Sequence, residues 1–318
     1  MSNHSESQYR RLSRSSDSGD SEMTMVAQLI HEIQNPETRE RALYILSKNR
    51  AVRGDLAPLL WHSFGTITTL LQEIISVYHL LSSPYLTDKA SNKVCNALVL
   101  LQGIAAHPDT KMLFIKAKIP LYLTAFLNNT NKEKSHEFLR LSSLGVIGAL
   151  VKVDDAQVVR FLLSSEILPS VLRCMEVGNE LSKTVATFIV YRILLNDEGL
   201  KYCSVLADRF FAIGHVLAKM IEKLAEDGRI AEDQSKRLLK HIIWCYHRLS
   251  ESPRACDGLR CCLPMKLRDS SFINVIRDDQ TAMHCLGQLF HNVAAGHPST
   301  TQKALQPVSP LLGHLIGG

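Results

Sequence analysis

The chain has 318 residues, of which 46% are hydrophobic and 21% are charged, and its formal net charge is +5. This balance excludes a wholly disordered chain, because enough apolar surface is available to form a core. The small net charge also gives no general indication of nucleic-acid binding. No apolar run approaches the roughly 18 residues of a membrane span, so we expect no membrane contact.

Eight cysteines are scattered along the chain without a CxxC pair. Such scattering is typical of a reduced protein rather than of a disulfide framework. The polar N-terminal segment contains no apolar stretch that resembles a secretory signal. We therefore expect a cytoplasmic protein, with the nucleus as a second compartment.

In chain order, the composition predicts three regions. Residues 1–22 include eight Ser and almost no large apolar residue, which predicts a disordered arm. Residues 23–298 have apolar residues at three- and four-residue spacings, which predicts a helical folded domain. Residues 299–318 contain Pro and Gly without helical periodicity, which predicts a flexible tail.

Within the folded region, many helix starts are marked by a polar residue followed by Pro. Pro suits the first helical position because its missing N–H would have no partner there. We expect such starts at Pro36, Pro108, Pro253 and Pro298. Further candidate helix caps are Asp155, Asp197 and Ser235.

A second proline signature recurs at Ile119-Pro120, Leu168-Pro169 and Leu263-Pro264. The first two prolines are 49 residues apart and the last two are 95 apart, so one copy without Pro should fall near residues 209–214. The charged run 226–236 reads as an insertion between two helices. Helical units of about 40–47 residues are typical of armadillo and HEAT solenoids, and the Ile-Pro step favours armadillo. The predicted fold is an all-α, armadillo-like helical-repeat solenoid with a long concave surface.

Several uninterrupted segments resemble one family closely. They are Leu60–Thr66 (LWHSFGT), Arg140–Leu150 (RLSSLGVIGAL), Glu180–Phe188 (ELSKTVATF) and Arg237–His241 (RLLKH). These segments resemble the "required for cell differentiation" family, the armadillo-repeat subunit of the Ccr-Not deadenylase complex. The resemblance extends from about residue 25 to residue 296, and it implies a non-catalytic adaptor in mRNA deadenylation, decay and translational repression.

The resemblance also implies two kinds of partner, the large Not-type scaffold subunit and regulators that carry short linear motifs. Scaffold contact is implied for His62, Phe64 and Thr68. A groove for helical peptides is implied at Val185. Without the resemblance, Phe64 and Val185 would be interpreted as core residues because of their apolar character and spacing. The resemblance leaves self-association into a homodimer open.

Pockets for inserted tryptophans are a third implied feature. The resemblance assigns their lining to positions Arg209, Pro253 and Arg254. Other members can carry an aromatic residue at the position matching Ala207, so one wall of the pocket is expected to be smaller here. Without the resemblance, both arginines would be solvated or paired with Asp208 or Asp257.

The alternative interpretation is an armadillo protein that binds single-stranded nucleic acid and acts in transcription regulation. A groove lined by Arg140, Lys183 and Arg192 could follow a phosphate backbone, and Tyr191 could stack on a base. Acidic residues interleave with these basic ones, however, and the sequence contains no recognised RNA-binding motif.

Enzyme interpretations find little support. Residues 178–184 (GNELSKT) imitate a phosphate-binding loop, but Ser182 replaces the second Gly and no strand is predicted before it. His241 and Cys245 share a helix face, yet His247 is turned away and the spacing of Cys256, Cys261 and Cys262 matches no zinc module. We therefore expect no enzyme activity, no catalytic residue, no metal site and no cofactor.

Overall fold

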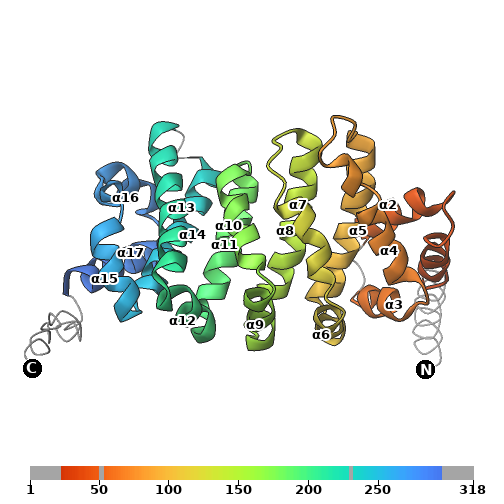
Figure 1. Ribbon diagram of the computed structural model, residues 1–318, viewed down its shortest axis with the longest axis horizontal. Helices are drawn as coiled ribbons and strands as arrows, with labels where there is room; N and C mark the ends of the chain where they lie inside the picture. Colours follow the sequence, from red (N-terminus) through yellow and green to blue (C-terminus); the bar gives the residue numbers. More distant parts are fainter. Residues whose placement is uncertain (1–22, 50–53, 229–231, 296–318) are drawn as a thin grey trace, which may run out of the picture.

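The computed structural model describes residues 23–49, 54–228 and 232–295, which form one elongated stack of helices (Figure 1). The predicted N-terminal arm at 1–22, the tail at 299–318 and the helix start at Pro298 lie outside the described residues. No strand occurs in the described ranges, and none of their helices is long and apolar enough to cross a bilayer.

The stack begins with helical residues 23–32 and continues through a regular series of elements. In chain order these are α2 (Arg39–Asn49), α3 (Leu56–His62), α4 (Thr66–Ile75), η1 (Tyr78–Leu80), α5 (Asp88–Ala106), α6 (Pro108–Lys116), η2 (Ile119–Leu123), α7 (Thr124–Leu127), α8 (Lys134–Val151), α9 (Ala156–Ser164), α10 (Ile167–Val177), α11 (Glu180–Leu195), α12 (Asp197–Val205), α13 (Ala207–Glu226), α14 (Asp233–Ser250), α15 (Pro253–Cys262), η3 (Met265–Arg268), α16 (Ser270–Ile276) and α17 (Gln280–Ala295).

One helix of each unit belongs to a continuous row. In this row α2 packs on α5, α5 on α8, α8 on α11, α11 on α14 and α14 on α17. The other helices pack behind the row, as α10 and α12 do against α11, with α9 and α13 packed in turn against α10 and α12. A row in which each member contacts its neighbours is the arrangement of a solenoid. The predicted all-α, armadillo-like solenoid is confirmed.

The local signals explain many of the helix boundaries. Helices α6 and α15 begin at Pro108 and Pro253, and the Asp155 carboxylate caps α9 by accepting from the amide N–H of Gln157 at 2.9 Å. Three signals were misleading. Helix α2 begins at Arg39, and Pro36 lies in the turn before it. The cap of α12 is Asn196 rather than Asp197, and Ser235 lies inside α14, where its hydroxyl donates to Glu180.

The proline signature marks a backbone reversal that recurs from unit to unit. Lys118 and Glu166 precede the first two copies, and both adopt left-handed backbone conformations with φ of 54° and 55°. The third copy leads into η3. The chain has no break near residues 209–214, where a fourth copy was predicted, because α13 continues through these residues as one helix. The charged run 226–236 was predicted to lie between two helices, and this holds only in part: α13 ends at Glu226, but α14 begins at Asp233 and includes the last four residues of the run, while residues 229–231 lie outside the described ranges.

Candidate functional site

The turn between α3 and α4 presents His62, Phe64 and Thr68 together on the surface. All three side chains are exposed, and Phe64 has a relative accessibility of 99%. The interpretation of Phe64 as a core residue is therefore wrong. A fully exposed aromatic ring gains nothing from the fold, whereas its burial against a partner would remove a large apolar surface from water.

The backbone that carries Phe64 is held by Gln34, which lies just beyond the first helical segment. Its Nε2 donates to the carbonyl oxygen of Phe64 at 2.8 Å, and its Oε1 accepts from the hydroxyl of Thr69 at 3.3 Å. Gly65 makes the turn with φ of 74°, and a Cβ there would lie 2.9 Å from Gln34 Oε1. The turn therefore has a fixed backbone, while the ring of Phe64 points to solvent.

A second candidate surface lies along the row between α8 and α11. Gly145, Gly148 and Ala149 of α8 are only partly buried and leave a low floor. A Cβ at Gly148 would lie 3.9 Å from Cγ1 of Val185, so Val185 of α11 borders this floor. Val185 is half-buried and packs against the core from one side. Small residues beside a partly exposed apolar wall allow close approach of a partner helix.

Aromatic rings continue this surface onto α14. The ring centroids of Tyr191 and Trp244 are 5.4 Å apart, and those of Phe188 and His241 are 5.7 Å apart. The Nδ1 atom of His241 and the indole N–H of Trp244 are buried without a hydrogen-bond partner among the described residues. Burial also lowers the pKa of His241 to about 4, so its ring is neutral at pH 7. The His241 ring therefore adds no charge to this surface at pH 7, and the two unpaired nitrogen atoms lie beneath it.

The residues assigned to the tryptophan pockets meet where α13 and α15 begin. Ala207, Pro253 and Arg254 are exposed, and Arg254 Nη1 donates to the carbonyl oxygen of Val205 at 3.2 Å. Arg209 pairs with no carboxylate in the part of the chain that the structure describes. Its guanidinium carbon lies 3.6 Å from the ring centroid of Tyr202. Arg209 thus already stacks on one aromatic ring.

The apolar character of this edge extends past the assigned residues. Phe211 and Leu206 are each 49% exposed and Val205 is 43% exposed. The junction between α12 and α13 therefore offers apolar surface next to the two arginines.

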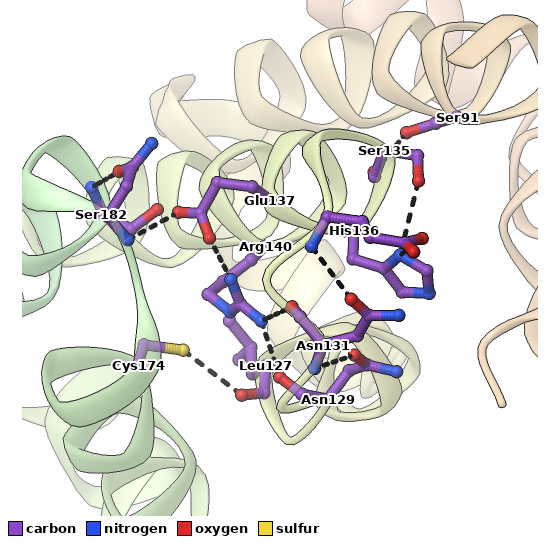
Figure 2. A network of polar contacts seen from close by, with 12 residues as sticks. Ser91, Leu127, Asn129, Asn131, Ser135, His136, Glu137, Arg140, Cys174 and Ser182 are labelled. Atoms are coloured by element: carbon purple, nitrogen blue, oxygen red, sulfur yellow. Dashed lines mark hydrogen bonds and ion pairs between the residues drawn. The ribbon is translucent and has the colours of Figure 1, made fainter. Parts of the chain in front are cut away.

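Arg140 does not line a groove, contrary to the nucleic-acid interpretation. Its side chain is fully buried, and it pairs with Glu137 and donates to the carbonyl oxygens of Asn129 and Asn131 at 2.7 and 2.8 Å (Figure 2). Glu137 Oε1 in turn accepts the N–H of Asn179 at 3.1 Å, just before α11. Arg140 therefore joins α8 to the loop before it, and Glu137 joins α8 to the next unit.

The other two basic residues of that interpretation are not brought together with Arg140 on one surface. Arg192 is half-buried and its Nε donates to the carbonyl oxygen of Val151 at 2.9 Å. Lys183 lines hollows near the start of α11. A continuous phosphate-binding groove through all three residues is therefore wrong.

No group of three or more metal-ligating side chains converges within the part of the chain that the structure describes. The Sγ of Cys256 donates to the carbonyl oxygen of Asn292, and the Sγ of Cys245 to that of Thr187. Burial raises the pKa of Cys203 to about 12, so its thiol stays protonated. These cysteines pack as small apolar residues.

Sequence reasoning missed Gln34 and the aromatic pairs of α11 and α14. Nothing near Gln34 in the sequence marks it, because its contacts are 30 to 35 residues away. The aromatic surface did have a signal, since Phe188 and Tyr191 are three residues apart and so are His241 and Trp244. That spacing places Phe188 and Tyr191 on one face of α11, and His241 and Trp244 on one face of α14.

Comparison with solved structures supports the fold alone. A designed armadillo repeat protein in complex with the peptide (KR)4 matches with a TM-score of 0.56 at 13% identity, covering 84% of this chain and 99% of the designed one. A second designed armadillo repeat protein matches with a TM-score of 0.56 at 16% identity, over 82% of this chain and 99% of its own.

Sequence relatives are much closer. The cell differentiation protein rcd1 of Schizosaccharomyces pombe is 51% identical over 273 residues, which is 86% of this chain and 94% of that protein. The protein CAF40 of Saccharomyces cerevisiae is 51% identical over 251 residues, which is 79% of this chain and 66% of that protein. The model of the cell differentiation family, Rcd1-like, matches residues 29–293. The chain therefore belongs to the Rcd1-like cell differentiation family.

Proposed function

We propose that this chain is a non-catalytic adaptor subunit of the Ccr-Not deadenylase complex, in the cytoplasm and also in the nucleus. It binds the Not-type scaffold at the turn between α3 and α4. The observation that carries this proposal is the 99% exposure of Phe64 on a turn whose backbone Gln34 holds in place. A rigid turn with an exposed aromatic ring has the character of an interface anchor, because little ordering remains to be done on binding.

Regulators that carry linear motifs bind elsewhere on the solenoid. The low floor of α8 and the wall at Val185 suit the apolar face of a short helix. The edge with Arg209, Pro253 and Arg254 suits an inserted tryptophan, because cationic guanidinium groups attract aromatic faces.

The experiment is affinity purification of the tagged chain from nuclease-treated lysate, followed by mass spectrometry. The unsubstituted chain should recover a large Not-type scaffold and nuclease subunits. Phe64→Ala should lose them. Phe211→Ala is the matched control, because it removes another exposed phenylalanine from α13, and it should retain the scaffold. Recovery of the scaffold with Phe64→Ala at the level of the unsubstituted chain would contradict the proposal.

Binding of regulators at the floor of α8 beside Val185, here called the groove, is tested separately with Gly148→Leu. This change fills the floor beside Val185 and should remove regulator peptides while the scaffold stays bound. Gly287→Leu is the control, because a Cβ added at this helical glycine would have no atom of another element within 4 Å. Equal recovery of regulators by both variants would exclude the groove between α8 and α11.

A further inference from the structure

Three adjoining hollows lie at the edge of the solenoid where α10 and α13 end and where α11 and α14 begin. Their volumes are about 160, 440 and 470 Å³, and all three are lined by Lys183 and Lys223. Lys132 lines one of the larger hollows and Lys219 the other. Lysines from three different elements thus line one place, and only Lys183 among them was named in the nucleic-acid interpretation.

These amines lack the partners that other charged side chains of the fold have. Among the described residues, no carboxylate oxygen lies within 4.0 Å of Lys132, Lys183, Lys219 or Lys223. Burial lowers the pKa of Lys183, and the charges of Lys223 and Lys132 lower it further, while the smaller effects of Asp227 and Glu180 raise it. An anion placed between the amines would offset both the lost hydration and this mutual repulsion.

Two nearby carboxylates are already engaged. Glu137 is paired with Arg140, and Glu180 accepts a hydrogen bond from Ser235. Glu176 and Asp227 also lie at the rim. Because their charges would repel a long polyanion that passed along this edge, such a ligand is a poor match. A single compact dianion can lie between the lysines without meeting both acids.

The smallest hollow also has an apolar side. Its apolar lining is Met220, Leu224 and Leu238, and its polar lining comprises the two lysines, Asn179, Ser235, and the carboxylates of Glu180 and Asp227. A ligand for this hollow therefore combines one concentrated negative charge with an adjoining apolar group. A phosphoserine or phosphothreonine beside an apolar residue in a peptide has this combination, and it carries about −1.5 to −2 charges at pH 7.

We propose that the hollow lined by Lys183, Lys223 and Met220 binds a phosphorylated serine or threonine in a linear motif, with the neighbouring apolar side chain against Met220 and Leu238. The inference rests on the adaptor function proposed above, because it names the chemistry of one class of motif. Phosphorylation of a regulator would then control its attachment to this edge of the solenoid.

Methionine methyl groups supply a direct readout. The full chain is labelled with ¹³C at its methionine methyls, and the Met220 signal is assigned with Met220→Leu. The probe is acetyl-Leu-phosphoSer-Leu-amide, compared with the same peptide without phosphate and with an oligouridylate. The remaining methionines report on the rest of the fold.

We expect the phosphopeptide to shift the Met220 signal in a saturable way and the unphosphorylated peptide to leave it in place. Lys183→Gln and Lys223→Gln should each weaken this binding about tenfold or more, because each removes a charge-assisted hydrogen bond. Lys201→Gln, at an exposed position of α12, should leave the affinity unchanged. Met175 lines an adjoining hollow, so unshifted signals of Met112 and Met283, which line none of the three hollows, show that each variant is folded.

Three results would overturn the inference. Met220 could fail to respond to the phosphopeptide at millimolar concentration, both peptides could act equally, or the oligouridylate could bind this hollow more tightly than the phosphopeptide. The titration uses the isolated chain, so its outcome is independent of whether Phe64→Ala loses the scaffold. Failure of one proposal is thus distinguishable from failure of the other.

Discussion

Neutralising Glu137 should destabilise the solenoid far more than neutralising an equivalent acid at the surface. Glu137 and Arg140 form an i,i+3 ion pair whose side chains are 11% and 0% exposed. Glu137→Gln leaves the guanidinium of Arg140 buried without a counter-charge, which costs about 3–5 kcal/mol. Asp257→Asn is the matched control, because Asp257 and Arg260 form an i,i+3 pair that is 41% and 36% exposed, and exposed pairs contribute about 0–1 kcal/mol.

Thermal denaturation followed by circular dichroism measures the difference. At about 2 °C per kcal/mol for a chain of this size, Glu137→Gln should lower Tm by about 6–10 °C and Asp257→Asn by at most about 2 °C. Hydrogen exchange should show faster opening at Asn129, Asn131 and the start of α11, where the network is anchored. Equal Tm values for the two variants would refute the reasoning.

Three further predictions concern burial, packing and recognition. The pKa of His241 is lowered from 6.5 to about 4, so as the pH falls the imidazole takes up its proton in the unfolded chain before it does so in the folded chain. The free energy of unfolding should therefore fall by about 2 kcal/mol by pH 5. Urea titrations of His241→Gln should show a smaller loss between pH 7 and pH 5. Gly199→Ala should cost about 3 kcal/mol in urea unfolding, because the added Cβ would lie 1.9 Å from the carbonyl oxygen of Ile193, whereas Gly287→Ala should be neutral or stabilising. Ala207→Tyr should tighten calorimetric binding of N-acetyl-tryptophanamide by about 2- to 12-fold, since an aromatic pair contributes about 0.5–1.5 kcal/mol, and an unchanged affinity would show that position 207 is not part of a tryptophan pocket.

The repeat architecture could be predicted from the sequence because its signals are local. Pro108, Pro253 and Asp155 act on the backbone within one turn of their own position, so their effect does not depend on the rest of the fold. Ser235 carries the same type of signal but lies within α14, where it bonds Glu180 across 55 residues. A tertiary partner overrides the local preference there.

The candidate sites were harder to predict because charge and hydrophobicity do not determine exposure. Phe64 is apolar yet exposed, since it lies on a turn rather than on a helix stripe. Arg140 is charged yet buried, and its position indicates why: it shares a helix stripe with Leu144, Ile147 and Val151, all of which are buried. Periodicity alone would place Arg140 inside, and the carbonyls that satisfy it come from a loop whose course the sequence does not reveal.

The turn with Phe64 and the edge with Arg209 are far apart on the solenoid, and this affects how fully a weak motif is bound. The turn with Phe64 lies toward one end of the stack and the edge with Arg209 and Arg254 toward the other (Figure 1). A motif tethered to a partner already bound at the turn with Phe64 meets the edge with Arg209 at an effective concentration of about 1 mM, provided that the flexible linker is long enough to span the separation. A motif with a Kd of only about 0.1 mM is then about nine-tenths bound. Short, individually weak segments can thus hold this protein durably once one of them is attached, and cutting the tether releases them without changing any contact.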